Sequence, residues 1–203
     1  MQIQLNKVGK RYNRDWIFKN VSFEFESGKR YAITGSNGSG KSTLLQVIAG
    51  AVIHNQGTIE YSFNQKRIQD AEFYKYSSIV APYLEVIEEM TATEFLHFHH
   101  SFKKLILPVE QILDIVGLTK ASDKQIRFFS SGMKQRIKMA QAFFSDTDVL
   151  FLDEPTTNLD QQGVDLYLTL IKEHSAGKTI LVASNDKTEY DFCETAISIH
   201  DYK

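Results

Sequence analysis

Hydrophobic and polar residues alternate near the start of the chain. The apolar members of this pattern are Ile3, Leu5, Val21, Phe23 and Phe25. A period of two is typical of strands that bury one face, and Gly28 marks a turn after them. The run 57–63 continues the pattern. The sequence therefore predicts a small antiparallel β subdomain in the N-terminal part of the chain.

From Pro82 to Asp148 the spacing of the apolar residues becomes helical. Thr91-Ala92-Thr93-Glu94 has the form of a capping box, which predicts that a helix begins there. Pro108 suits the first position of a second helix, and Gly117 is placed to end it. A third helix is expected after Ser131. We therefore predict an inserted α-helical subdomain over 82–148.

Continuous apolar runs dominate the last part of the chain. Residues 149–152 and 179–183 have the composition of strands that are buried on both faces, and 196–199 is a shorter candidate. Helical spacing between the first two runs ends at Gly177. Strands that alternate with helices form parallel sheets. The predicted fold class is α/β, with a mostly parallel sheet flanked by helices.

Composition narrows the class of protein without naming it. The 203 residues are 42% hydrophobic and 24% charged, as in ordinary globular domains. The net charge of −2 gives no reason to expect a nucleic-acid partner. Cys193 is the only cysteine and suits a reducing cytoplasm. No apolar run approaches the ~20 residues of a membrane helix, so work at a membrane would require a partner that anchors this chain.

A glycine-rich stretch carries the strongest chemical signal. It fits the spacing G-x-x-x-x-G-K-[ST] and consists of Gly35, Ser36, Asn37, Gly38, Ser39, Gly40, Lys41, Ser42 and Thr43. The glycines allow a tight curl in which backbone N–H groups point at a polyphosphate. Lys41 adds a charge for the β- and γ-phosphates, and Ser42 is placed for Mg²⁺. An apolar run precedes the stretch and a helical pattern follows it, so we predict a phosphate-binding loop.

A second signal is the pair Asp153 and Glu154, which directly follows the apolar run 149–152. A strand that ends in two carboxylates can present one to a cation and the other to a reacting water. A third signal precedes this pair. Its residues are Phe129-Ser130-Ser131-Gly132-Met133-Lys134-Gln135-Arg136.

With these three motifs in this order, the chain resembles the ATP-binding-cassette (ABC) family, whose signature reads LSGGQ where this chain has FSSGM. The run from Asp153 to Asp160 also matches the family, in which it forms the Walker B and D-loop run, and the resemblance covers essentially the whole chain. It implies a P-loop NTPase core and a single ABC ATPase domain over 1–203. The nucleotide-binding core would comprise 1–81 and 149–203, and the helical signature subdomain 82–148. Because little of the sequence follows the last predicted strand, we expect a minimal cassette with no regulatory C-terminal domain.

The resemblance assigns roles to the loop and to the acidic pair. Lys41 and the loop amides would hold the phosphates of ATP, and Ser42 and Asp153 would hold Mg²⁺. Glu154 would act as the general base that polarises the attacking water. Tyr12 stands where the family places an aromatic residue that stacks on adenine, with Trp16 as the competing aromatic.

The signature implies a second subunit. In this family the serine and the glycine amide at the positions of Ser130 and Gly132 contact the γ-phosphate bound to the opposite subunit. Asp160, in the D-loop run, is assigned to nucleotide binding as well. A chain with one phosphate loop and one signature is therefore expected to pair with a second cassette, most simply as a homodimer.

The family pattern is broken in several places. Ser131 and Met133 replace a glycine and a glutamine, and the β-carbon of Ser131 would crowd the backbone if that position needed a positive φ. We expect the signature contact to survive. Asn185 occupies the place of the switch histidine, where its amide would act as a weakened sensor of the γ-phosphate. Tyr83 replaces a glutamine. The nearby carboxylates of Glu85, Glu88 and Glu89 are expected to form a solvated acidic face, and a substitute ligand for Mg²⁺ among them is the alternative.

The leading interpretation is an ATP-binding and ATP-hydrolysing subunit that powers transport as part of an ABC transporter. Its membrane-spanning permease subunits would be separate chains, and the cassette would be cytoplasmic and peripheral on the cytoplasmic face of the membrane. Family analogy slightly favours export. A soluble ABC ATPase that acts on ribosomes or DNA, and a weakly active regulatory cassette, are the alternatives. A helix would place His97 and His100 on one face, but two ligands are too few for a structural zinc. His97, His99 and His100 are therefore expected to be ordinary surface histidines.

Overall fold

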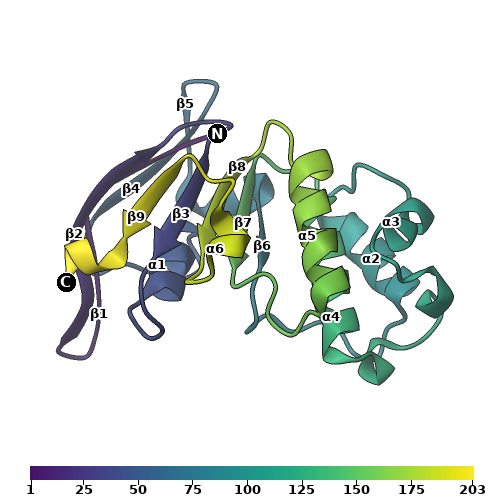
Figure 1. Ribbon diagram of the computed structural model, residues 1–203. Helices are drawn as coiled ribbons and strands as arrows, with labels where there is room; N and C mark the ends of the chain where they lie inside the picture. Colours follow the sequence, from purple (N-terminus) through teal and green to yellow (C-terminus); the bar gives the residue numbers. More distant parts are fainter. The chain divides into compact units, whose positions relative to one another are not determined.

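The computed structural model describes residues 1–203, which form two compact units (Figure 1). The first unit contains Met1–Ser77, Thr147–Glu154 and Gly177–Lys203, and the second contains Ser78–Asp146 and Pro155–Ala176. The strand β6 (Ser77–Val80) includes the point at which the chain first passes between them.

An antiparallel sheet occupies the N-terminal part of the first unit. Its strands, in the order β2-β1-β4-β5, are β1 (Gln2–Tyr12), β2 (Asp15–Phe25), β4 (Gln56–Phe63) and β5 (Lys66–Ile68). Ile3 pairs with Phe25 and Leu5 with Phe23. Ile3, Leu5 and Phe25 are fully buried. The strands predicted from the period of two are therefore confirmed.

A parallel sheet forms the rest of the first unit. Its strands in this unit, in the order β7-β8-β3-β9, are β3 (Arg30–Thr34), β7 (Val149–Asp153), β8 (Thr179–Ala183) and β9 (Thr195–Ser198). Every residue of β7 and β8 is buried, as the continuous apolar runs predicted. The helices of this unit are α1 (Lys41–Ile48), α6 (Lys187–Tyr190) and the 3₁₀ helices η1 (Asp70–Tyr76) and η4 (Ile199–Tyr202).

A chain of aromatic rings joins the two sheets of this unit. Tyr61 of β4 stacks on Phe73 of η1 with 3.8 Å between ring centroids, and Phe73 packs edge-on against Phe151 of β7 at 6.2 Å. The hydroxyl of Tyr61 donates to the carbonyl of Ile48 at the end of α1. The antiparallel part therefore shares a core with the parallel sheet and helix α1.

The second unit is helical. Its helices are α2 (Ala92–Phe102), α3 (Val109–Ile115), α4 (Ser131–Phe143), α5 (Gln161–His174) and the 3₁₀ helices η2 (Thr119–Ala121) and η3 (Ile126–Phe128). The capping box is present, because Thr91 Oγ1 accepts from the Glu94 N–H and the Glu94 carboxylate accepts from the Thr91 N–H. Pro108 precedes α3 as its N-cap, one residue before the predicted position. Gly117, with φ 69°, follows the end of α3.

The two compact units differ from the predicted division in the placement of α5, and by a few residues at the other boundaries. The sequence places 149–203 in the core, whereas Pro155–Ala176, which includes α5, belongs to the second unit. The reason is the packing of α5 on α4. Tyr167 is fully buried, and its ring lies edge-on to Phe143 at 6.4 Å.

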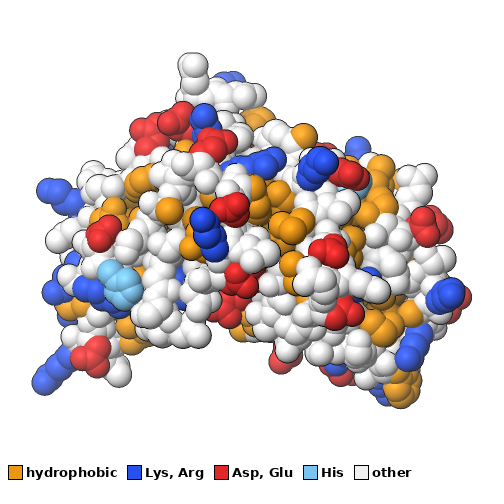
Figure 2. Space-filling view, in the orientation of Figure 1, with side chains coloured by type: hydrophobic (Ala, Val, Ile, Leu, Met, Phe, Trp, Pro, Cys, Tyr) orange, Lys and Arg blue, Asp and Glu red, His pale blue; other side chains and the backbone are white.

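The surface agrees with the small net charge. Acidic and basic side chains are interspersed on the face shown in Figure 2. None of the helices combines the length and the apolar character needed to cross a membrane. No group of three or more His, Cys, Asp or Glu side chains is arranged to hold a metal ion. The expectation that all three histidines of α2 are ordinary surface residues is wrong for His99, which is half-buried with Nε2 2.8 Å from Ser145 Oγ.

Candidate nucleotide-binding site

Three strands of the first unit end at the same edge of the parallel sheet. Ala183 of β8 pairs with Asp153 of β7 on one side and with Ile33 of β3 on the other. In open parallel sheets, ligands bind outside the carboxyl ends of the strands. The segments that follow these three strands carry the phosphate loop, Glu154 and Asn185. The topology thus brings together residues that are far apart in the sequence.

The phosphate loop follows β3 and leads into α1. Gly38 has φ 74° and Gly40 has φ 103°, so both lie in the left-handed region that favours glycine. A β-carbon at Gly40 would run into the side chain of Ile17, whereas nothing lies near Gly38. The curl therefore depends on these glycines, and it leaves open space at Gly38.

Lys41 lies inside the curl. Its side chain is only 4% exposed, and its ammonium donates to the carbonyl of Ser36 at 3.2 Å. Ser39 Oγ, in the same loop, is buried without a hydrogen-bond partner. The loop therefore offers a polyphosphate the ammonium of Lys41, the hydroxyl of Ser39 and a backbone curled by glycines, and all three suit an anion.

Ser42 and Asp153 form the second part of the site. Ser42 Oγ donates to Asp153 Oδ1 at 2.9 Å, and Asp153 is buried at the end of β7. Hydroxyl and carboxylate oxygens are hard ligands of the kind that Mg²⁺ prefers. The donor set therefore fits the cation that the sequence predicted.

Glu154 has an unusual backbone conformation. Its φ is 42°, in the left-handed region that non-glycine residues rarely adopt, and its N–H donates to the carbonyl of Ala183 at 3.0 Å. Such conformations concentrate at functional sites. A cavity of about 210 Å³ is lined by residues of the phosphate loop and, in addition, by Ile17 and Glu154. The strained residue is thus the carboxylate that faces the phosphate cradle.

Neither of the two aromatic candidates lines this cavity. Tyr12 ends β1, is 49% exposed and has the ammonium of Lys10 4.8 Å from its ring centre. The ring centre of Trp16 is 5.5 Å from the guanidinium of Arg11 and 5.0 Å from the ammonium of Lys19. Ile17, which does line the cavity, was missed because an isoleucine in a strand carries no sequence signal of a ligand contact.

The signature residues lie at the start of α4 in the second unit. Ser130 is the N-cap, and its Oγ accepts from the Met133 N–H at 3.2 Å. Ser131 is the first residue of the helix and has no positive φ, so its β-carbon meets no backbone strain. Gln135 donates to the carbonyl of Pro155 at 2.7 Å.

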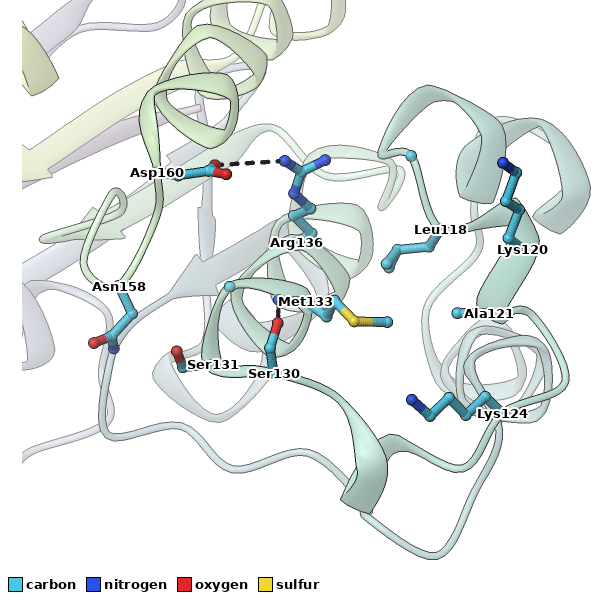
Figure 3. A pocket seen from close by; sticks show the side chains of 12 residues that line it. Leu118, Lys120, Ala121, Lys124, Ser130, Ser131, Met133, Arg136, Asn158 and Asp160 are labelled. Atoms are coloured by element: carbon cyan, nitrogen blue, oxygen red, sulfur yellow. Dashed lines mark hydrogen bonds and ion pairs between the residues drawn. The ribbon is translucent and has the colours of Figure 1, made fainter.

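An ion pair continues this link between α4 and the segment before α5. Arg136 lies 3.7 Å from Asp160, which also caps α5 by accepting from the Gly163 N–H (Figure 3). The signature and the D-loop run are therefore held to each other within this unit. Both border a hollow of about 560 Å³ that Lys120 and Lys124 line from the other side.

The segment in which the family places its glutamine also lies in the second unit. Tyr83 is 46% exposed. Glu88 forms an ion pair with Lys134, and the ammonium of Lys138 donates to the carbonyls of Ala81 and Pro82 at 3.4 Å and 3.3 Å. Burial lowers the pKa of Lys138. The metal-ligand alternative for Glu85, Glu88 or Glu89 stays untested, and Glu88 already has a cationic partner.

The sequence as a whole was compared with known protein families. A sequence model of the ABC transporter family matches residues 18–157, which is more than half of the chain. The chain belongs to this family. It is an ABC ATPase, and the predicted family and ATPase class are confirmed.

Individual relatives of this cassette extend over nearly all of it. The uncharacterized ABC transporter ATP-binding protein YybJ of Bacillus subtilis is 32% identical, covering 98% of this chain and 92% of that protein. The linearmycin resistance ATP-binding protein LnrL of the same organism is 30% identical over 98% of this chain, but this covers only 66% of its length. The cassette thus spans slightly less than two thirds of some of its relatives.

Solved structures show the same fold. A putative ABC transporter ATP-binding protein from Pyrococcus furiosus has a TM-score of 0.83 at 17% identity, and each chain is covered completely. The cassette MJ0796, in a dimeric post-hydrolysis state bound to ADP and Pi, has a TM-score of 0.82 at 24% identity, with 97% of this chain and 93% of that chain covered. The predicted P-loop fold with antiparallel and helical parts is therefore confirmed. ABC ATP-binding subunits act as dimers, as that structure illustrates.

Proposed function

We propose that this cassette binds Mg·ATP at its phosphate loop, pairs with a second cassette and hydrolyses ATP to drive transport through separate membrane subunits. The observation that carries the proposal is the meeting of the phosphate loop, Asp153 and Glu154 at one edge of the parallel sheet. Family membership indicates that the reaction is ATP hydrolysis, and the residues at this edge of the sheet include the groups that ATP hydrolysis requires.

Each group has a role that follows from its chemistry. The loop amides and the ammonium of Lys41 bind the β- and γ-phosphates, and Ser42 with Asp153 holds Mg²⁺. When bound, Mg²⁺ would neutralise negative charge on the phosphates. Glu154, held at the rim of the cavity by its N–H bond to Ala183, accepts a proton from the attacking water. Asn185 is positioned at the same edge as a neutral hydrogen-bond donor.

A second copy of the chain would complete the site. Ser130 and Gly132 at the start of α4 offer a hydroxyl and a helix N-terminus, both of which suit an anion. The hollow beside them is lined by Lys120, Lys124 and Arg136, whose charges favour the same kind of ligand. We propose that Ser130, Gly132 and Asp160 contribute to the nucleotide site of the partner cassette, and that the pair is a homodimer.

The transport role is supported by the relatives. One is described as an ABC transporter ATP-binding protein and another as a resistance ATP-binding protein. We infer that permease subunits on separate chains anchor this cassette at the cytoplasmic face of a membrane. The transported substrate would be selected by those subunits.

ATPase measurements test the catalytic part of the proposal. Glu154→Gln should lower the steady-state rate by about 10²- to 10⁴-fold while ATP binding is retained. Lys41→Ala should lose both binding and hydrolysis. Glu173→Gln, a change at an exposed glutamate of α5, serves as the matched control and should behave as the parent. Equally negligible ATPase rates in the parent and in Glu154→Gln would favour the regulatory alternative. Asn185 and Tyr83, which replace the family's histidine and glutamine, are the residues that motivate this alternative.

Co-purification tests the transport part. A neighbouring gene that encodes several apolar spans of about 20 residues would supply the candidate permease. The cassette should sediment with membranes when this permease is present and stay in the supernatant when it is deleted. Sedimentation with ribosomes or retention on DNA, independent of the permease, would favour the soluble alternative instead.

A further inference from the structure

The 3₁₀ helix η4 lies against the phosphate loop. The N–H of Ser36 donates to Nε2 of His200 at 3.3 Å, and the same nitrogen is 3.5 Å from Ser36 Oγ. A ring nitrogen accepts a hydrogen bond only when it carries no proton. Nε2 of His200 is therefore positioned to accept the N–H at the start of the loop.

Lys203, the residue after η4, contacts the far part of the same loop. Its ammonium donates to the carbonyl of Ser39 at 2.6 Å and to the carbonyl of Ile17 at 3.0 Å. One side chain thus joins the loop to β2, in which Ile17 lies next to Gly40. Charge-assisted bonds of this kind are stronger than neutral ones.

Apolar packing accompanies the polar contacts. Ile199 is fully buried, and its Cγ2 lies 2.6 Å from the place that a β-carbon on Gly35 would occupy. The loop therefore meets η4 and Lys203 at its beginning, through Gly35 and Ser36, and again at Ser39. We call residues 199–203 the loop brace.

The brace bears on the groups that would bind phosphate. The carbonyl of Ser36 accepts from the ammonium of Lys41 and from the N–H of Ser39, so the position of Ser36 sets both. In a trans peptide the C=O and the following N–H point in opposite directions. When Lys203 holds the carbonyl of Ser39, the N–H of Gly40 is turned to the other side of the peptide plane, away from Lys203.

We propose that His200 and Lys203 are positioning residues that hold the phosphate loop in the shape that accepts a polyphosphate, and thereby raise the affinity for ATP. This inference rests on the proposed function, because it assumes that the loop binds ATP. Neither side chain lines the cavity, so both act through the loop.

A matched pair of substitutions tests His200. In His200→Gln the side-chain oxygen reaches about as far as Nε2 and can accept the Ser36 N–H, whereas the shorter His200→Asn cannot. Lys203→Met keeps the length of the side chain and removes its donors. His97→Gln, at an exposed histidine of α2, is the control for a histidine change elsewhere.

Two measurements are made on each full-length variant. The first is the dissociation constant of the non-hydrolysed analogue adenylyl-imidodiphosphate with Mg²⁺, by calorimetry. The second is amide hydrogen exchange of a peptide covering 35–40 in the nucleotide-free protein. His200→Asn and Lys203→Met should each weaken binding about twofold to tenfold, the loss expected for one hydrogen bond, and should speed the exchange. His200→Gln and His97→Gln should match the parent in both.

Several outcomes would overturn the inference. If the parent, His200→Asn and Lys203→Met all bind the analogue with the same affinity, this inference is contradicted while the proposed function stands. Faster exchange or a lower melting temperature without a change in affinity would show that the brace is structural only, and would also contradict it. If the parent does not bind the analogue, and Lys41→Ala behaves in the same way, both the proposed function and this inference are contradicted.

Discussion

Ser42 Oγ donates a hydrogen bond of 2.9 Å to Asp153 Oδ1, although the two residues lie 111 positions apart in the sequence. The bond joins the first turn of α1 to the end of β7. It exists because β3 and β7 flank β8 in the same sheet, so the helix that follows one strand begins beside the last residue of the other. The hydroxyl and the carboxylate that would hold the cation therefore lie within hydrogen-bond distance of each other.

This pair predicts how the enzyme depends on Mg²⁺. Asp153→Asn keeps the shape of the side chain and removes its charge, so the Mg²⁺ concentration for half-maximal ATPase activity should rise about 10- to 100-fold. Ser42→Ala should act in the same direction. Asp123→Asn, at an exposed aspartate, is the control. An unchanged Mg²⁺ requirement in Asp153→Asn would show that this carboxylate does not hold the cation.

Asn185 gives a second prediction. It is exposed and lies two residues after Ala183, which pairs with Asp153. If its amide contacts the γ-phosphate, Asn185→Ala should lower the ATPase rate about threefold to tenfold, as expected for one lost hydrogen bond. Asn185→His, which restores the family residue, should raise the rate above that of the parent. Equal rates in all three proteins would remove the sensor role.

The adenine contact is tested by a pair of ligands. Stacking on an aromatic ring contributes about 1–3 kcal/mol, so Tyr12→Ala should weaken binding of the ATP analogue about fivefold or more. Tripolyphosphate lacks the base, and its binding should not change. Trp16→Ala is the competing variant. If it produces the loss and Tyr12→Ala does not, the stacking role belongs to Trp16.

Patterns that depend on neighbouring residues were predictable from the sequence. The period of two gives β1 and β2, and the uninterrupted apolar runs give β7 and β8, because burial on one or both faces dictates the residue types. The capping box at Thr91 is equally local, since both of its bonds join residues three apart. The phosphate loop was found for the same reason.

Contacts that depend on topology were not predictable. Ser36 and His200 each lie two positions after Thr34 and Ser198, which pair across β3 and β9. The contact between the loop brace and the phosphate loop can be predicted only if β3 and β9 are known to be neighbours. The same holds for α5, whose spacing predicts a helix but does not say that Tyr167 packs on Phe143.

His99 illustrates this limit on a single side chain, because its partner Ser145 lies 46 positions away. Burial lowers the pKa of His99 to about 4, and the charges of Lys103 and His100 add to the effect. The ordinary value of 6.5 applies in the unfolded chain. Protonation therefore favours the unfolded state between these two values.

This shift predicts an acid-sensitive fold. The stability linked to His99 is fully present above pH 6.5 and is lost as the pH falls from there to about 4. His99→Gln does not titrate, so the parent should lose roughly 1 kcal/mol more unfolding free energy than the variant between pH 7 and pH 4.5, a figure reduced from the full shift because solvent screens a half-buried ring. Urea denaturation across this range measures the difference, with His97→Gln as the control at an exposed histidine of the same helix. Parallel stability curves for the parent and His99→Gln would mean that the ring titrates equally in both states, and its burial would then carry no linkage to pH.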